Sequence, residues 1–306
     1  MSFDITGLQS WVALNSKQIA TKAIANATTA KLFINNSAVQ YGIKGSVGVL
    51  KLDTSASLQV FNGCAVRTGS GTIALSNKQI SVTRINDFTT LNKAALDNTY
   101  YQVFVSQGAD PSIPLMDVLA SKIIDEKTLY IALANEQLLW QGNTSLTGST
   151  FLSFFDGIAK QVTGSTSGYI SLSAATGATY VEQLQNAFLL MPPEVRNSPD
   201  FRLFIGQDAF DSYTVALANK NIYKATDDMK AFGTSAIIQP TTGLNGTKQI
   251  FAGRISAFQL GLDGLDDTDK AELLYSLETK CWYLDYNYAM GVCVVYPEQI
   301  GYGKLN

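Results

Sequence analysis

The side chains of this chain that could carry out chemistry are carboxylates, lysines and cysteines, because histidine is absent from all 306 residues. Without histidine, the Ser-His-Asp and Cys-His nucleophile systems and the commonest zinc ligand are excluded. Asp125, Glu126 and Glu136 fall on one predicted helix, where no evident cleft makes them a facing acid–base pair. We therefore predict no enzyme activity and interpret the three carboxylates as surface or inter-subunit charges.

The three cysteines, Cys64, Cys281 and Cys293, form no CxxC pair, so neither a zinc site nor a redox motif is predicted. If the last segment is a hairpin that turns near Asn287, Cys281 and Cys293 would face each other across it. We expect them to be small core residues of a reduced protein rather than a disulfide.

An acidic run in the last sixth of the chain is the remaining candidate for a metal site. Its members are Asp263, Asp266, Asp267, Asp269 and Glu272. They lack the spacing of a calcium-binding loop, and they precede a predicted helix, Lys270 to Leu277, which they would cap. Gly69-Ser70-Gly71 lacks the lysine of a phosphate loop and is expected to be a turn. No metal and no cofactor is predicted.

The composition favours a protein that buries much of its surface in partners. Charged residues make up 15% of the chain, against about 25% in an average soluble domain. The net charge of −3 and the pI of about 5.1 exclude a basic nucleic-acid binder. We find no signal peptide at the N-terminus and no apolar run of the roughly 20 residues that span a bilayer, so no membrane is expected.

Charge is divided unevenly along the chain. Residues 1–95 hold nine basic and three acidic residues, and residues 96–306 hold thirteen basic and twenty-two acidic ones. A basic first third and an acidic remainder could attract each other between copies of the chain. The alternative is a chance distribution of solvated lysines.

A long helix in the middle of the chain is the strongest structural signal. Asp110 suits the N-cap and Pro111 the first helical position, and Gly142 ends the helix after Trp140. Apolar residues at helical spacing predict one buried stripe: Met116, Leu119, Ile123, Ile124, Ile131 and Leu138. About 28 residues give a rod of ~42 Å, and a compact enzyme rarely needs such a rod.

The remaining elements are predicted from short patterns. Residues 1–45 read as an extended or partly helical arm that needs a neighbour to hold it. Residues 46–86 read as β-strands with turns at Asp53–Ser57 and Ser76–Lys78, and Thr89–Leu96 as a short helix. Predicted helices follow at Phe151–Val162, Tyr180–Leu190 and Gln207–Ala218, with strands at 201–205, 236–238 and 249–262, a hairpin at 278–296 and a tail at 297–306.

Five local sequences stand out in this order. The long helix ends in Glu136-xxx-Trp140-Gln-Gly-Asn and is followed by the small helix Phe151–Val162. The α/β region contains Leu189-Leu-Met-Pro-Pro-Glu, Phe201-Arg-Leu-Phe-Ile and Ala209-Phe-Asp-Ser-Tyr, and the chain closes on Gly291-Val-Cys-Val-Val-Tyr-Pro-Glu-Gln-Ile300. Over nearly the whole chain, the order and character of these elements resemble the major capsid protein of tailed bacteriophages, with its HK-97-like shell fold.

The resemblance implies an α+β, HK-97-like capsid fold with five parts. They are an N-terminal arm (1–45), a β-hairpin E-loop (46–86), a P-domain (87–145) with a spine helix at about 111–140, an α/β A-domain (146–285), and a C-terminal strand and tail (286–306) that return to the P-domain. It also implies self-assembly into hexamers and pentamers of an icosahedral-type head that encloses double-stranded DNA. The protein would lie in the virion capsid after assembly in the host cytoplasm.

The implied partners are other copies of the chain, the portal, scaffolding and head-decoration proteins, and packaged double-stranded DNA through non-specific contacts. Candidate inter-subunit contacts are Lys44, Lys51, Arg67, Lys78, Arg84, Asp125, Glu126 and Glu136. One alternative of the same fold is a cellular nanocompartment shell. Another, of a different class, is a tail-tube, adhesin or carbohydrate-binding β-rich structural protein, against which the long helix argues.

Overall fold

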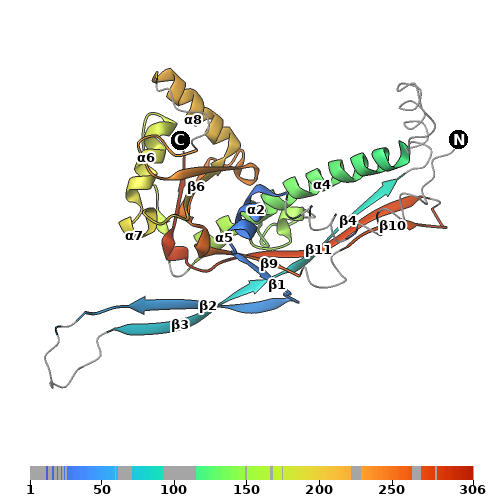
Figure 1. The fold of residues 1–306 in the computed structure, drawn as a ribbon, viewed down its shortest axis with the longest axis horizontal. Coiled ribbons are helices and arrows are strands. Elements are labelled where there is room, and N and C mark those ends of the chain that lie inside the picture. Colours follow the sequence, from blue (N-terminus) through green and yellow to red (C-terminus); the bar gives the residue numbers. More distant parts are fainter. Residues whose placement is uncertain are drawn as a thin grey trace.

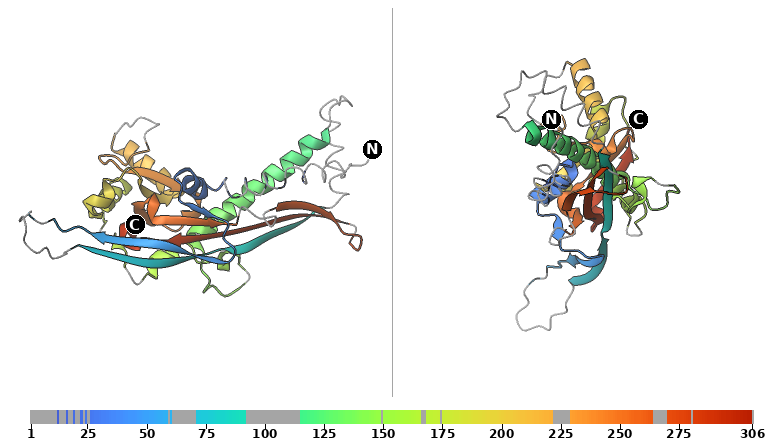
Figure 2. Two further views of the ribbon diagram at one scale, coloured as in Figure 1. Left: turned by 60° about the horizontal axis from the view of Figure 1, so that its bottom comes forward. Right: turned by 90° about the vertical axis from the view of Figure 1, so that its right-hand side faces the viewer.

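The computed structural model shows a long, narrow molecule. It describes residues 26–58, 60, 71–91, 115–148, 150–165, 168–173, 175–221, 229–263, 270–279 and 281–305, together with Val12, Ser16, Ile19, Lys22 and Ile24. A two-stranded hairpin projects at one end, and a three-stranded ribbon beside a long helix forms the other (Figure 1). A sheet with its helices stands to one side of the line between these two ends (Figure 2).

The projecting hairpin consists of β2 (Ser46–Ser55) and β3 (Thr72–Ser81). The two strands are antiparallel and pair along their whole length, from Ser46↔Ser81 to Ser55↔Thr72. Only Val82 separates β3 from β4 (Thr83–Leu91), which turns away to join the ribbon. The hairpin is therefore the end of a long β path that continues into the body.

The first sheet is built around β11 (Trp282–Val294), a strand of 13 residues. One half of β11 lies between β4 and β10 (Lys270–Tyr275), and these three strands form the ribbon. The other half pairs with β9 (Phe258–Leu262), which pairs in turn with β1 (Val39–Tyr41). One strand thus connects the ribbon to the centre of the molecule.

The long helix α4 (Leu115–Gln141) covers one face of this sheet. Ile124, Ile131 and Leu138 of its predicted stripe are buried in the larger hydrophobic core. The short helix α2 (Thr28–Asn35) packs beside α4, and its Phe33 stacks on Phe258 of β9 with ring centroids 5.7 Å apart. The larger core therefore lies between these two helices and the first sheet, and it extends beyond them to Phe204 and Phe251.

The second sheet has the strand order β5-β12-β8-β6-β7 and its own hydrophobic core. Its strands are β5 (Ile170–Ser171), β6 (Phe201–Gly206), β7 (Ile237–Thr241), β8 (Gln249–Arg254) and β12 (Ile300–Lys304). Helices α6 (Tyr180–Leu190), α7 (Pro193–Arg196) and α8 (Gln207–Asn219) lie against it, and α5 (Ile158–Thr163) lies near α4. Short 3-10 turns complete the chain at Phe151–Ser153, Thr242–Leu244, Ile255–Ala257 and Pro297–Gln299.

Several predicted elements are confirmed. The long helix is present with its C-terminal end next to Gly142, while its predicted start lies outside the described residues. Tyr180–Leu190 is a helix with the predicted bounds, and the strand from Phe201 and the helix from Gln207 each extend one residue beyond the predicted end. Phe151–Val162 is only partly helical, because a 3-10 turn and a separate short helix replace the single helix.

Other predictions are wrong. The turn expected at Ser76–Lys78 is strand, and so is the first part of the turn expected at Asp53–Ser57, because β2 and β3 pair without interruption up to Ser55↔Thr72. Ala56 and Ser57 follow the end of β2 and are not strand. Thr89–Leu91 lies in β4, and Lys270–Tyr275 is the strand β10, whose Ala271 and Leu273 are buried in alternation. Ser276 and Leu277, the last two residues of the helix expected at Lys270–Leu277, are not helical either. Residues 92–96 of the helix expected at Thr89–Leu96 lie outside the described part of the chain.

The expectations for both termini also need correction. Asn287 lies within β11, so no hairpin turns there. The segment 297–306, predicted as a tail, contains the strand Ile300–Lys304, which pairs with β8 and β5 in the second sheet. Near the N-terminus, Val12, Ile19 and Ile24 are buried in the chain's own core. These described residues of the arm are therefore held by the chain itself rather than by a neighbour.

Candidate inter-subunit surfaces

One face of the projecting hairpin carries an exposed apolar stripe, formed by Leu50, Leu52, Ile73 and Leu75. Leu52 lies directly opposite Leu75, and alternate residues of a strand share a face, so all four side chains lie on one side. Their exposed fractions are 62%, 47%, 75% and 65%, respectively. Four large apolar side chains gathered on a projection are typical of a surface that another molecule covers.

The opposite face of the hairpin is bound to the body only near its base. Val49 and Ile80 form a small hydrophobic core with Ile43, Cys293 and Val295. Val82 N donates a 2.8 Å hydrogen bond to Gly45 O and closes the base. Beyond this core the residues Leu52–Ser55 and Thr72–Asn77 are all exposed, so the outer half of the hairpin reaches away from the body.

Gly291 of β11 lies against the backbone of Ser81 and Val82, where β3 leads into β4. A Cβ atom placed on Gly291 would collide with the backbone carbonyl oxygen of Ser81, and it would lie 3.2 Å from Cα of Val82. The backbones therefore approach more closely here than any other residue would allow. This close approach fixes the position from which the hairpin departs.

Lys51 faces the body and is largely buried, with 9% of its side chain exposed. Its Nζ lies 2.7 Å from Glu298 Oε1 and 3.3 Å from Asp53 Oδ2. Burial favours the neutral amine, but the contacts with Glu298 and Asp53 outweigh it and raise the pKa of Lys51 above its ordinary value. Lys51, one of the residues predicted to contact a neighbour, is therefore engaged within its own chain.

Glu136 is also engaged within the chain, with 1% of its surface exposed, so the expectation that it is a surface charge is wrong. Its carboxylate accepts hydrogen bonds from Thr29 N, at 2.9 Å, and from Thr29 Oγ1. Trp140 Nε1 donates to the same Thr29 hydroxyl, at 2.8 Å. Burial raises the pKa of Glu136, although the bonds from Thr29 act in the opposite direction. This network joins α2 to the C-terminal end of α4.

The exposed side of α4 offers a second surface. Asp125 and Glu126 are exposed, as predicted, and the next turns of the helix expose the apolar side chains of Leu129, Tyr130 and Leu133. Neighbouring positions on a helix surface lie three or four residues apart, so these side chains form a mixed acidic and apolar surface.

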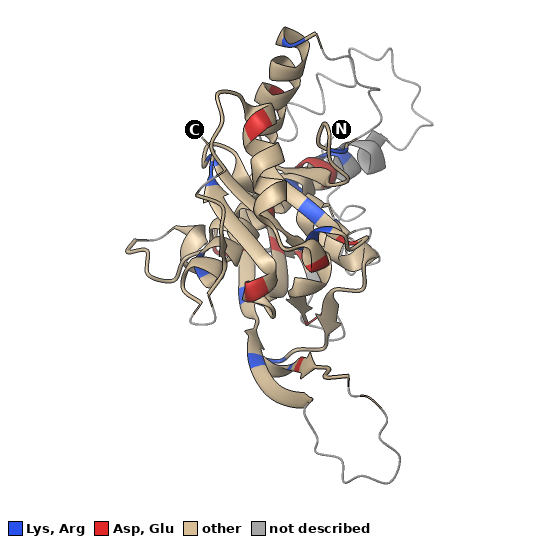
Figure 3. Cartoon of the chain, turned by 90° about the vertical axis from the view of Figure 1, so that its left-hand side faces the viewer, with Lys and Arg blue, Asp and Glu red and all other residues tan. Residues whose placement is uncertain are grey.

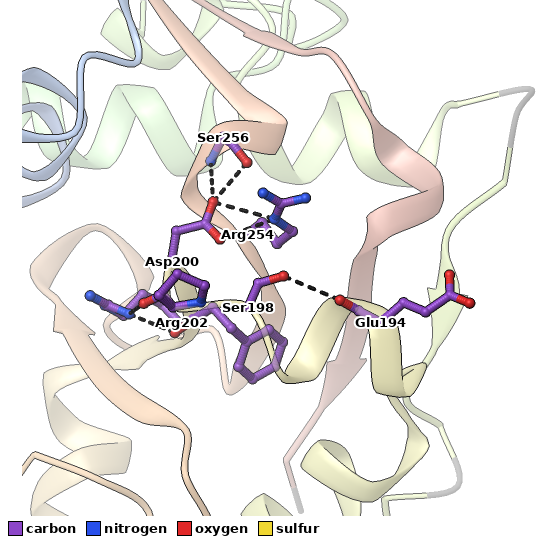
Figure 4. Close-up of polar contacts among 8 residues, drawn as sticks. Glu194, Ser198, Asp200, Arg202, Arg254 and Ser256 are labelled. Carbon is purple, nitrogen blue, oxygen red and sulfur yellow. Dashed lines mark hydrogen bonds and ion pairs between the residues drawn. The ribbon is translucent and has the colours of Figure 1, made fainter. Parts of the chain in front are cut away.

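A polar cluster joins the start of β6 to the end of β8 (Figure 4). Asp200 accepts hydrogen bonds from Arg254 Nε at 3.0 Å and from Ser256 Oγ at 2.7 Å, while Arg202 donates to the carbonyl oxygen of Pro199 at 2.9 Å. Burial opposes the charged form of Asp200, but the bonds from Ser256 and Arg254 hold its pKa below the ordinary value. The cluster therefore holds together the ends of two neighbouring inner strands of the second sheet.

The other predicted contact residues lie on the surface without forming one cluster. Lys44 and Arg84 are exposed, Lys78 is half-buried, and Arg67 lies outside the described residues. Charged side chains are widely spaced on a mostly uncharged chain (Figure 3). Sequence reasoning missed the apolar stripe and the role of Lys51. The available signal was the alternation of side chains along a strand, because Lys51 shares its strand face with Val47 and Val49.

Cys281 and Cys293 are free thiols, and they do not lie opposite each other across a hairpin, because Cys281 directly precedes β11 and Cys293 lies within it. Burial raises the pKa of the Cys293 thiol to about 11. Within the described ranges, no group of three or more His, Cys, Asp or Glu residues could hold a metal ion. The helices of the described part include none with the length and apolar character of a membrane span.

No family model matches the sequence, and no curated protein does. The structure, however, is similar to chains of solved phage particles. A chain from "Satellite phage P4 procapsid including size determination (Sid) protein" has a TM-score of 0.52 and 11% identity, over 89% of this chain and 98% of that one.

Two further phage structures give a similar result. A chain of Microbacterium phage Oxtober96 has a TM-score of 0.55 and 11% identity, over 88% of both chains. A chain from "The capsid of Myoviridae Phage XM1" has a TM-score of 0.50 and 14% identity, over 89% of this chain and 91% of that one. Identities this low concern the fold alone, and the match covers most of each chain. The chain therefore has the HK-97-like fold of phage capsid proteins that its sequence resembles.

Proposed function

We propose that this chain is a major capsid protein, which assembles with copies of itself into the shell of a phage head. The observation that carries the proposal is the apolar stripe on the projecting hairpin. A soluble monomer gains nothing from holding Leu50, Leu52, Ile73 and Leu75 in water on a two-stranded projection. A neighbouring copy that covers the stripe would remove this apolar surface from water.

In this proposal the parts of the chain have separate roles. Residues 1–45 are the N-terminal arm, 46–86 the E-loop, 87–145 the P-domain, and 146–285 the A-domain around which hexamers and pentamers form. The E-loop contains the hairpin, and its apolar stripe lies on the neighbouring copy. The C-terminal strand over 286–306 serves both sheets, since β11 belongs to the first and β12 to the second.

The proposed shell is icosahedral in type, encloses double-stranded DNA through sequence-independent contacts, and assembles in the host cytoplasm. Portal, scaffolding and head-decoration proteins are its proposed partners. The low content of charged residues, 15%, supports extensive burial of surface between subunits.

The test compares two adjacent residues of β3 that point to opposite faces. Leu75→Gln removes apolar surface from the stripe, whereas Ala74→Gln adds the same side chain on the other, exposed face. We expect the double variant Leu52→Gln/Leu75→Gln to weaken each contact between the stripe and a neighbouring copy by about 2 kcal/mol, which is a roughly thirtyfold change in the association constant. Electron microscopy and sedimentation should show fewer shells, while Ala74→Gln assembles like the natural chain.

Circular dichroism of dilute protein is the control, because all three variants should remain folded. Shells of normal yield from Leu52→Gln/Leu75→Gln would contradict the role of the stripe. Monodisperse monomers of the natural chain, with and without co-expressed phage proteins, would contradict the capsid function itself. Particles that enclose a protein rather than DNA would indicate a nanocompartment shell.

A further inference from the structure

Two consecutive residues of β2 contact the turn near the C-terminus. The Nζ of Lys51 lies 2.7 Å from Glu298 Oε1 and 5.6 Å from the centroid of the Tyr296 ring. Leu52 N donates to the Tyr296 hydroxyl at 3.4 Å. An ion pair, a cation–π contact and a backbone hydrogen bond therefore meet at one point between the hairpin and the body.

This point is the outermost buried contact of β2. From Ser46 to Lys51 the buried residues are Val49 and Lys51, and every residue from Leu52 to Leu58 is exposed. Because the strands beyond Lys51 are supported only by each other, a small rotation there becomes a large displacement at the far end. The direction of the hairpin is thus determined where Lys51 is held.

The turn that holds Lys51 joins the two sheets. Pro297–Gln299 follows β11 of the first sheet and leads directly into β12 of the second. Pro297 and Ile300 are buried, so the turn is fixed to both. A group bound to this turn is therefore oriented with respect to the whole body rather than to one strand.

We propose that Lys51, Tyr296 and Glu298 form a clamp that sets the direction in which the hairpin leaves the body, with Lys51 as its positioning residue. The use of this direction to present the apolar stripe to a neighbouring copy rests on the proposed function. The clamp itself is a property of the single chain. Removal of the Lys51–Glu298 link would leave β2 and β3 paired but free to swing.

The experiment measures the orientation of the hairpin in the full chain. Spin labels at Ser57→Cys and Asn197→Cys, in a background with Cys64→Ser and Cys281→Ser, report the distance from the hairpin to the second sheet. Both label positions are exposed. Dilution of labelled chains into unlabelled ones restricts the measurement by pulsed electron paramagnetic resonance to distances within one chain.

We expect a narrow distance distribution for the natural clamp and loss of the narrow peak in both Lys51→Met and Glu298→Ala. The double variant should be no broader than either single one, because each change removes the same link. Asp53→Asn is the matched control. Asp53 also contacts Lys51 but lies on the same strand, so this change should preserve the narrow peak.

An unchanged narrow peak in Lys51→Met and Glu298→Ala would overturn the proposal, as would an equal loss in Asp53→Asn. Failure of both single variants to fold would also overturn it, because the link would then maintain the fold rather than a direction. Assembly is scored separately. If the natural chain shows the expected distances but forms no shells, the clamp is retained and the capsid function is rejected. If the natural chain forms shells but Lys51→Met and Glu298→Ala leave the distances unchanged, the clamp is rejected and the capsid function is retained.

Discussion

Two carboxylates, Glu136 and Asp200, illustrate how much the surroundings of a single residue matter in this molecule. Glu136 lies inside the core, where Thr29 donates two hydrogen bonds to its carboxylate, while Asp200 lies nearer the surface beside Arg254. Burial dominates at Glu136 and raises its pKa, whereas hydrogen bonds and the neighbouring charge lower the pKa of Asp200. The two residues therefore affect the pH dependence of folding in opposite directions.

The first prediction concerns Glu136→Gln. A raised pKa in the folded chain means that the stabilisation from protonated Glu136 is complete below the pKa of the unfolded chain, and it is lost as pH rises through the folded pKa. The amide that replaces the carboxyl group stays neutral at every pH. We expect the variant to gain stability relative to the natural chain as pH rises, measured by urea unfolding of dilute protein at several pH values.

The comparison with Asp200→Asn provides the control for this prediction. The lowered pKa of Asp200 gives stabilisation that is present above the unfolded pKa and lost as pH falls through the folded one. We therefore expect Asp200→Asn to lose stability relative to the natural chain as pH rises, whereas Glu136→Gln gains it. A difference between Glu136→Gln and the natural chain that does not vary with pH would contradict the account of Glu136.

At the scale of elements, the junction of β3, β4 and β11 depends on the absence of a side chain at Gly291. We predict that Gly291→Ala costs about 1–3 kcal/mol of unfolding free energy, because a Cβ atom there collides with the backbone carbonyl of Ser81. Gly48→Ala in β2 is the matched control, because its Cβ would meet only the side chain of Asn77, at 3.8 Å or more.

Urea unfolding monitored by circular dichroism measures both changes. Gly48→Ala should remain within about 0.5 kcal/mol of the natural chain, as surface changes usually do. Equal effects of the two substitutions would show that the close approach at Gly291 is not what holds the hairpin base.

An element could be predicted from the sequence when the residues that determine it lie next to it in the chain. The long helix and Tyr180–Leu190 carry their apolar spacing and their stop signals, Gly142 and Pro192, in the adjacent sequence. Asn287 looked like a turn residue, but in β11 it accepts a hydrogen bond from Asn86 of the neighbouring strand. That partner is remote in sequence, so local propensity could not reveal the strand.

The candidate surfaces show the same limit. The lysines of the hairpin were visible as charges, yet the partner of Lys51 is Glu298, near the other end of the chain. Thr29 and Glu136 likewise meet only after α2 packs on α4. Residue types therefore indicated where charged groups lie, while the folded topology decided which of them stay exposed and which are engaged within the chain.

At the scale of the whole molecule, charge is separated along the chain, and we expect the proposed assembly to be sensitive to salt. Residues 1–95 carry a net charge of +6 and residues 96–306 a net charge of −9. If copies attract each other through these parts, sodium chloride should slow and weaken assembly, because it screens charges beyond about 8 Å at 0.15 M. Light scattering across a series of sodium chloride concentrations measures this effect.

Arg84→Glu tests which charges are responsible. Arg84 is exposed, whereas Lys51 is unsuitable because it is bound to Glu298. We expect Arg84→Glu to weaken assembly and flatten its salt dependence, and Lys122→Glu, an exposed change in the acidic part, to do neither. An unaltered salt dependence in Arg84→Glu would favour solvated charges without a role between copies.

The length of β11 has a mechanical consequence. β3 runs into β4 with only Val82 between them, and β4 is matched to β11 by nine residue pairs, from Thr83↔Met290 to Leu91↔Trp282. A tension that pulls the hairpin along its own axis would load this ladder in shear, so its hydrogen bonds must rupture together rather than open one after another. In the proposed shell, such a joint would resist tension that acts along the strands.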